Sequence, residues 1–286
     1  MKKSNLEQEF NIFINSQLIE SCQLMYDIAN KECSGGVLDE KSCGWYHSAW
    51  QYLRILDKVS SPTWHFNFYY KSFFDYLSNE SKVLITGTAD YTLLALLYFV
   101  ATKKNVKPQI WVCDICRSPL LICQHFANVN KFSLSVIQEN ILTFDINETF
   151  DIITTDAFLS RFYLTQKKKI ISKWNSLLSN QGKIITTIKV DENIALDEES
   201  KVIDKKDSYV RDVEILVAKS ELKNQINRIL NLAETYITKI VSIPFSGQKE
   251  IENVFSEHGF RIHFWETVVV KGEAQPTKYI RVVAEK

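Results

Sequence analysis

The sequence predicts an α/β fold: a doubly wound, seven-stranded and mostly parallel β-sheet whose last strand is antiparallel, preceded by an N-terminal helical addition. Two observations lead to this prediction. From residue 82 onward, short apolar runs alternate with stretches of helical periodicity, as in parallel strands joined by crossover helices. The last two apolar runs are joined only by a short polar turn, and strands connected in this way pair antiparallel. We therefore expect a helical region over residues 1–80 and one α/β domain over residues 81–286.

The first 80 residues contain three segments with helical character. Residues 5–30 place apolar side chains close to helical spacing, and Gly35-Gly36 ends this segment. A second segment runs from about residue 46 to residue 59, before Pro62, and a third, rich in aromatic side chains, covers 64–77. These segments predict three helices ahead of the sheet.

The rest of the chain supplies the strands and the helices between them. We expect strands at 82–86, 109–113, 133–137, 150–154, 183–189, 260–270 and 278–284. We expect helices at 90–103, 118–130, 165–179, 217–238 and 248–258. Residues 191–209 are charge-rich, include the acidic run Asp197-Glu198-Glu199 and lack a strand-like run, which predicts an exposed loop or a mobile lid. Together with the following helix, this segment forms an insertion at about 191–240.

Composition narrows the class of partner. Lys plus Arg and Asp plus Glu number 34 each, so the formal net charge is zero and exerts no overall attraction on nucleic acid or anionic lipid. The N-terminus lacks the uninterrupted apolar stretch of a signal peptide, and the longest apolar run, Leu93–Ala101, is too short to cross a bilayer. We therefore expect a cytoplasmic protein with no nucleic-acid or membrane partner. A monomer and a homodimer are both compatible with the sequence.

The first candidate binding element is the strand, turn and helix over residues 83–98. Gly87 lies in the turn, where backbone N–H groups and the helix dipole point at a ligand over the sheet edge. An ordinary strand-to-helix turn is the alternative. Asp114 ends the second strand, 27 residues after Gly87, and a carboxylate there can accept both ribose hydroxyls of an adenosine. These two residues predict nucleoside binding and alone would serve either NAD or an adenosyl cofactor.

Polar residues also follow the third and fourth strands. After the third strand, Asn140 suits the exocyclic amine of adenine and Ile141 suits the face of its ring, with a plain polar turn as the alternative. The fourth strand ends in Thr155 and Asp156, at the edge where open α/β sheets bind ligands. Arg161 follows closely and either lines the pocket or forms a salt bridge.

Taken together, these segments resemble the class I S-adenosylmethionine-dependent methyltransferases. The resemblance covers residues 82–190 and, through a helix followed by an antiparallel strand pair, residues 240–286. Leu177–Ile184 is similar to the family's turn into its fifth strand. In that family the first turn carries an acidic residue and glycines at alternate positions. This chain has Ile85 at the acidic position and keeps only Gly87.

The resemblance implies a Rossmann-like domain, S-adenosyl-L-methionine as cofactor and methyl transfer as the reaction. Asp114 matches the family's ribose-binding acid, and Asn140 matches its aspartate near adenine. Asp90 or Asp156 would replace the missing acid at the methionine end. The implied cofactor-binding residues are Thr86, Gly87, Thr88, Ala89, Asp90, Asp114, Ile115, Asn140, Ile141, Asp156 and Tyr69.

The N-terminal aromatic segments have two interpretations. By resemblance, the N-terminal helices fold over the cofactor and shape the substrate pocket, with Tyr69 or Tyr70 in contact with the cofactor. Alternatively, the aromatic side chains fill the core of a helical subdomain. His47 and His65 are the candidate general bases, because imidazole titrates near neutrality, although each also has a structural interpretation.

The six cysteines are expected to remain reduced thiols in a chain without an export signal. Cys113 and Cys116 have the spacing of a metal or redox pair. Zinc needs four ligands, however, and no second pair with suitable spacing is present, so we expect core thiols and no metal. Cys123 and His125 are expected to pack in the helix that follows.

The function predicted from these features is methyl transfer to a small-molecule acceptor by in-line displacement. The acceptor would enter between the N-terminal helices and the insertion. One alternative keeps the cofactor and transfers its aminocarboxypropyl group. A second, motivated by Ile85, is a non-catalytic binding or partner subunit. A third is an NAD-type Rossmann protein, against which the antiparallel terminal strand pair argues.

Overall fold

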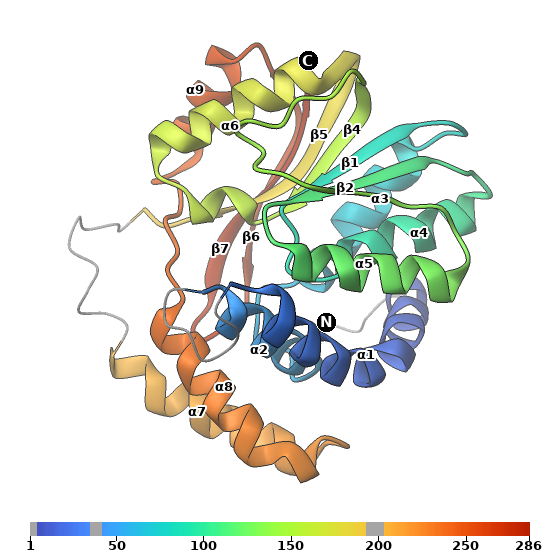
Figure 1. Ribbon diagram of the computed structural model, residues 1–286. Helices are drawn as coiled ribbons and strands as arrows, with labels where there is room; N and C mark the ends of the chain where they lie inside the picture. Colours follow the sequence, from blue (N-terminus) through green and yellow to red (C-terminus); the bar gives the residue numbers. More distant parts are fainter. Residues whose placement is uncertain (1–4, 35–41, 193–202) are drawn as a thin grey trace.

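The computed structural model describes residues 5–34, 42–192 and 203–286, and its strands form one sheet in the order β3-β2-β1-β4-β5-β7-β6 (Figure 1). The strands are β1 (Lys82–Thr86), β2 (Gln109–Asp114), β3 (Ser135–Gln138), β4 (Phe150–Asp156), β5 (Leu178–Val190), β6 (Arg261–Val270) and β7 (Thr277–Glu285). Strands β1 to β5 pair in parallel, and β7 is antiparallel to both β5 and β6. The predicted fold class, including the antiparallel last strand, is confirmed.

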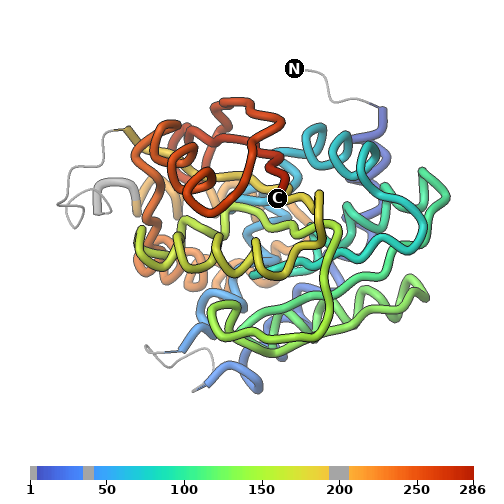
Figure 2. The backbone as a smooth tube through the Cα atoms, turned by 90° about the horizontal axis from the view of Figure 1, so that it is seen from above, coloured from blue at the N-terminus to red at the C-terminus, as the bar shows by residue number. Residues whose placement is uncertain are grey.

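Helices cover both faces of the sheet, because successive residues of a strand point to opposite sides. Val83 and Ile85 of β1 face a core shared with α1 (Asn5–Glu32), α3 (Phe66–Tyr76), α4 (Thr92–Lys104) and α5 (Arg117–Asn130). Leu84 faces the opposite core, which contains α6 (Leu164–Leu177) and α9 (Gln248–Glu257). Figures 1 and 2 show α6 and α9 side by side on this face. Burial on both sides explains why these strands are continuous apolar runs.

Three further helices pack together beside α1. Helices α2 (Gly44–Ile55), α7 (Ile203–Ala218) and α8 (Ile226–Lys239) share a core that includes Leu53, Val213 and Ile229. Figure 1 shows α7 and α8 as an antiparallel pair outside the sheet. Across the ranges that the structure describes, no helix is both long and apolar enough to cross a membrane.

Helix α7 corrects the sequence prediction of a loop or lid over 191–209 and a single helix over 217–238. Residues 193–202, which include the acidic run at 197–199, lie outside the described residues. From Ile203 onward the chain is helical, and Tyr209, Val213 and Val217 are buried at every fourth position. A short turn and the 3-10 segment Lys223–Gln225 separate α7 from α8. The charged side chains between the buried positions concealed the helical stripe.

Candidate active site

A cavity of about 480 Å³ lies at the carboxyl edge of the sheet. Its floor is built by residues at the ends of four neighbouring strands: Gly87 after β1, Asp114 of β2, Asp156 of β4 and Lys189 of β5. Strand β1 pairs with both β2 and β4, so the chain winds away from it in two directions. Ligands of open α/β sheets bind at this kind of switch point. The size of the cavity is also typical of cofactor and substrate sites.

Seven of the residues predicted to bind the cofactor line this cavity. They are Gly87, Thr88, Ala89, Asp90, Asp114, Ile115 and Asp156. The predicted base His47 also lines it. Residues from three strand ends, far apart in the sequence, thus meet in one place, as the parallel winding requires.

The turn at Gly87 depends on glycine. Its φ is 65°, in the left-handed region that other residues adopt only with strain. A Cβ atom added here would lie 2.2 Å from the Phe158 ring, so the ring packs directly on the backbone of the turn. The Gly87 N–H donates to the carbonyl oxygen of Cys113 at 2.9 Å, which fixes the turn to the end of β2.

Asp114 is held by two backbone N–H groups. Thr88 donates to one carboxylate oxygen at 3.0 Å, and Cys116 donates to the other at 2.7 Å. Burial raises the pKa of this carboxyl above its ordinary value, and the two N–H groups partly oppose that shift. Each carboxylate oxygen retains acceptor capacity, because a carboxylate offers about four lone-pair sites. Asp114 is therefore oriented and able to accept further hydroxyl groups.

Asp156 is the second carboxylate in the cavity. One of its oxygens accepts the Thr187 hydroxyl at 2.6 Å and lies 2.8 Å from the Tyr69 hydroxyl. Burial raises its pKa to about 6, and these hydrogen bonds act in the opposite direction. At neutral pH the group is thus mostly ionised and retains an acceptor oxygen for a cation or a donor.

Asp90 has a different environment. Its carboxylate forms an ion pair with the Arg54 guanidinium, 2.6 Å apart, and both side chains are almost fully buried. The other oxygen accepts the Thr92 N–H at 2.8 Å, next to the start of α4. Although Asp90 lines the cavity, its charge is already neutralised by Arg54. The pair joins α2 to the first turn of the sheet.

Two residues of the prediction lie behind the cavity wall. Tyr69 is fully buried, and its hydroxyl contacts Asp156 and the Thr155 carbonyl oxygen, each at 2.8 Å. His65 is also fully buried, with its Nδ1 accepting from Arg281 Nε at 3.3 Å. Burial lowers the pKa of His65 to about 3, so the ring stays neutral at physiological pH. Neither side chain lines the cavity within the described residues, which does not support His65 as a base.

Three other predicted contacts also lie outside the cavity lining. Thr86 is completely buried in β1, and Ile141 is buried in the core beside α6. Asn140 is exposed after β3, where its side-chain oxygen accepts the Leu142 N–H at 3.0 Å and closes a polar turn. The adenine role of Asn140 and Ile141 stays a prediction.

A second polar group in the cavity centres on Glu273, which sequence reasoning missed. Its carboxylate accepts the Tyr236 hydroxyl at 3.0 Å and the Ser60 N–H at 3.2 Å. Ser60 in turn shares a hydrogen bond with the Tyr279 hydroxyl at 3.0 Å. Gly272, at φ 69°, makes the turn between β6 and β7 that brings Glu273 over the sheet edge.

Arg161 lines the same part of the cavity beside aromatic side chains. Its guanidinium donates to the Val241 carbonyl oxygen at 2.7 Å and lies 5.2 Å from the Tyr46 ring centre. Trp45 and Trp50 of α2 complete this wall. The sequence left two roles open for Arg161, and the structure places it in the lining.

Comparisons with known proteins agree with this architecture. The sequence matches no protein-family profile and no curated protein. An S-adenosylmethionine-dependent methyltransferase from Clostridium acetobutylicum superposes over 82% of this chain and 95% of its own, at 10% identity and a TM-score of 0.51. A second, from Methanosarcina mazei, covers 74% of this chain and 95% of its own, at 15% identity and a TM-score of 0.50.

A third similar structure is the [4+2]-cyclase SpnF, which covers 76% of this chain and 79% of its own at 11% identity and a TM-score of 0.50. At these identities the likeness concerns the fold. The chain has the fold of the class I S-adenosylmethionine-dependent methyltransferases.

Proposed function

We propose that this protein is an S-adenosylmethionine-dependent methyltransferase that acts on a small-molecule acceptor. The observation that carries the proposal is the arrangement of Asp114 beside the Gly87 turn, in a cavity at the switch point of a methyltransferase fold. A fixed carboxylate with free acceptor sites suits the two hydroxyls of a ribose.

The residues present fit an adenosyl cofactor best at its ribose end. Asp114 would accept the ribose hydroxyls. Gly87, which carries no side chain, would let the cofactor approach the backbone of the turn closely. At the methionine end, Ile85 is 1% exposed and apolar, so it cannot hold an ammonium group. Asp156, ionised at neutral pH and in the cavity lining, is the residue we assign to that role.

The acceptor would bind in the part of the cavity formed by Tyr46, Arg161 and Glu273. Aromatic walls with a few fixed polar groups suit a small, partly apolar molecule. The zero net charge of the chain favours such an acceptor over a nucleic acid. Access would run between α2 and the end of α8, both of which contribute to the lining.

The protein's contribution to the reaction would be alignment and control of charge. S-adenosylmethionine, when bound, supplies an electrophilic methyl group on a sulfonium. The aromatic wall would orient the acceptor for in-line attack, and positioning of this kind supplies much of the rate gain. Glu273, fixed by Tyr236 and Ser60, would take a proton from the acceptor where one is released.

Calorimetric titration with S-adenosylmethionine tests the proposal, with NAD as the contrast ligand. We expect saturable binding of S-adenosylmethionine and none of NAD. Preference for NAD would instead indicate a dinucleotide protein. Absence of S-adenosylmethionine binding at millimolar concentration would contradict both the methyl-transfer and the aminocarboxypropyl-transfer hypotheses. It would leave the hypothesis of a non-catalytic partner subunit.

One alternative reaction has a specific motivation. Ile85 replaces the acid that usually holds the methionine end, and SpnF demonstrates that a cyclase can have this fold. Transfer of the aminocarboxypropyl group is therefore the second candidate. Mass spectrometry of the nucleoside product distinguishes the two reactions: S-adenosylhomocysteine indicates methyl transfer, and methylthioadenosine indicates the alternative.

A further inference from the structure

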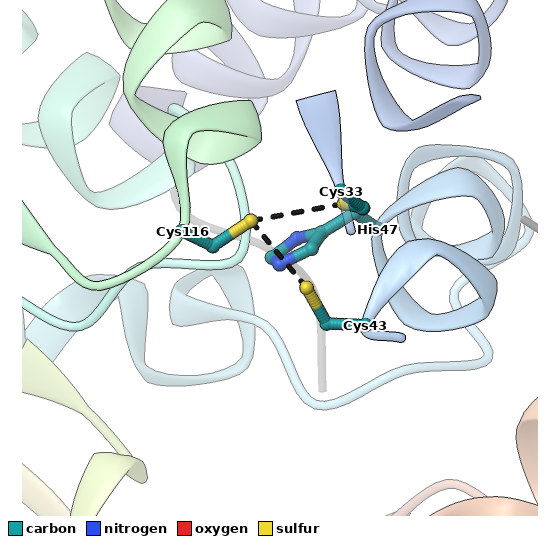
Figure 3. A group of neighbouring side chains, drawn as sticks. All are labelled: Cys33, Cys43, His47 and Cys116. Carbon is teal, nitrogen blue, oxygen red and sulfur yellow. Dashed lines mark hydrogen bonds between the residues drawn. The ribbon is translucent and has the colours of Figure 1, made fainter. Parts of the chain in front are cut away.

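Four potential metal ligands meet at the edge of the cavity. Cys33 follows α1, Cys43 and His47 lie at the start of α2, and Cys116 directly precedes α5. Each offers one donor atom, and these four atoms all lie within 4.8 Å of one another. Figure 3 shows the His47 imidazole directed into the space between the three sulfur atoms.

The separations between the sulfur atoms fit a tetrahedral metal site. The Sγ of Cys116 lies 3.7 Å from that of Cys33 and 3.5 Å from that of Cys43. Around zinc, with Zn–S bonds of about 2.3 Å, tetrahedral geometry places two sulfur ligands about 3.8 Å apart. A disulfide would instead require a separation of about 2.05 Å. The cluster is thus spaced as ligands around a common ion.

His47 gives an independent indication of a ligand. Its side chain is buried, with the residue 5% exposed, and its Nδ1 has no hydrogen-bond partner within the described part of the chain. A buried polar nitrogen without a partner is unfavourable, because it has lost its hydrogen bonds to water. Coordination of a metal ion through Nδ1 would remove that deficit.

The surroundings support thiolate ligands. Cys43 and Cys116 are the N-cap residues of α2 and α5, and the positive end of a helix dipole favours the thiolate form. The Ser118 hydroxyl lies 3.1 Å from the Cys33 sulfur, where it can donate to a thiolate. The Cys116 N–H donates to Asp114, which couples the cluster to the proposed ribose-binding carboxylate.

We propose that Cys33, Cys43, His47 and Cys116 bind a structural zinc ion. Four protein ligands close the coordination sphere, which is typical of structural rather than catalytic zinc. The ion would fasten the N-terminal helices to the start of α5 and so to the cavity wall. In this role His47 is a ligand and not the general base that its imidazole group suggested in the sequence.

This proposal departs from the expectation of no metal, which considered Cys113 and Cys116 as a pair. Cys113 is buried in β2, with its thiol directed at the Glu139 carbonyl oxygen at 3.6 Å, and is not part of the cluster. The partners of Cys116 come instead from 73 and 83 residues earlier in the chain.

Metal analysis of the purified, reduced full-length chain tests the site without reference to any enzymatic activity. We expect one zinc per chain, and on replacement by cobalt(II) the absorption bands of a tetrahedral thiolate complex. Cys43→Ser and His47→Ala should each lose stoichiometric zinc. Cys43 is exposed, so its serine variant should fold. Cys123→Ala is the matched control, because Cys123 lies in α5 outside the cluster, and it should retain zinc.

A second readout is thermal unfolding. A zinc chelator should lower the melting temperature of the unaltered chain and leave that of Cys43→Ser unchanged, because metal binding energy is folding energy. Any of three results would overturn the proposal: no zinc or cobalt bound at one equivalent by the reduced protein, a disulfide among the three cysteines in freshly purified protein, or equal zinc content in Cys43→Ser and Cys123→Ala.

Discussion

Replacement of Asp114 by asparagine tests the proposed ribose contact while keeping the shape of the side chain. In the free protein the carboxylate accepts the N–H groups of Thr88 and Cys116, at 3.0 and 2.7 Å. A hydrogen bond to a charged group contributes about 1.5–3 kcal/mol and a neutral one about 0.5–1.5 kcal/mol. Loss of charge assistance in two ribose hydrogen bonds therefore weakens binding by about 2 kcal/mol, which corresponds to about 30-fold in Kd.

The assay is calorimetric titration with S-adenosylhomocysteine, which shares the ribose and is chemically stable. Asp75→Asn is the matched control, since Asp75 is exposed on α3, pairs with Lys71 and lies outside the cavity lining. Thermal unfolding of each variant shows whether the fold is retained. A well-folded Asp114→Asn protein whose Kd stays within about twofold of the unaltered chain would refute the ribose assignment.

Three further predictions concern stability. Gly87→Ala should lower the urea midpoint, because its positive φ alone is unfavourable by about 1–2 kcal/mol for a residue with a Cβ; Gly247→Ala, where an added Cβ meets nothing within 3.8 Å, should be close to neutral. Asp156 has a folded pKa raised to about 6, so its ionisation opposes folding above that pH, and the penalty is relieved as pH falls from about 6 toward about 4. The free energy of unfolding of Asp156→Asn, measured by urea titration, should therefore rise relative to that of the unaltered chain by up to about 2–3 kcal/mol as the pH increases from 4 to 7. A difference that does not change with pH would contradict this prediction. Asp90→Ala should lose about 3–5 kcal/mol in the same assay because Arg54 is left buried without its partner, and a loss under about 1 kcal/mol would show that the pair is not needed.

The sheet could be predicted from sequence because its determinants are local. Strands buried on both faces appear as apolar runs, as Val83–Ile85 illustrates, and amphipathic helices between them carry their own periodicity, as α9 illustrates. Where charged residues surround a narrow buried stripe, the helical periodicity of apolar residues is hard to recognise. Among the side chains that the structure describes in α7, Tyr209, Val213 and Val217 are the buried ones, so the segment resembled a loop.

The floor of the candidate site could also be predicted, and its walls could not. Gly87, Asp114 and Asp156 end parallel strands, and the carboxyl ends of parallel strands converge at one edge whatever the details of packing. Glu273 reaches the cavity through the turn between β6 and β7, and Arg161 through the 3-10 segment Phe158–Arg161. The positions of both depend on tertiary packing. The spacing of residues along the sequence does not show where tertiary packing will place these two side chains.

The cysteine cluster illustrates the same limit. Cys113 and Cys116 are close in sequence, but Cys113 lies on a strand and Cys116 in the turn that follows it, and their side chains point in different directions. Cys33 and Cys116 meet only because α1 packs against α5. Ligand spacing along the chain therefore predicts sites within one hairpin or turn better than sites assembled from distant helices.

A crystal structure with bound S-adenosylhomocysteine tests the central proposal most directly. We predict that both ribose hydroxyls lie within hydrogen-bond distance of the Asp114 carboxylate and that the amino group of the ligand lies next to Asp156. A ligand bound away from the carboxyl edge of β1 and β2, or a ribose turned away from Asp114, would contradict the proposal.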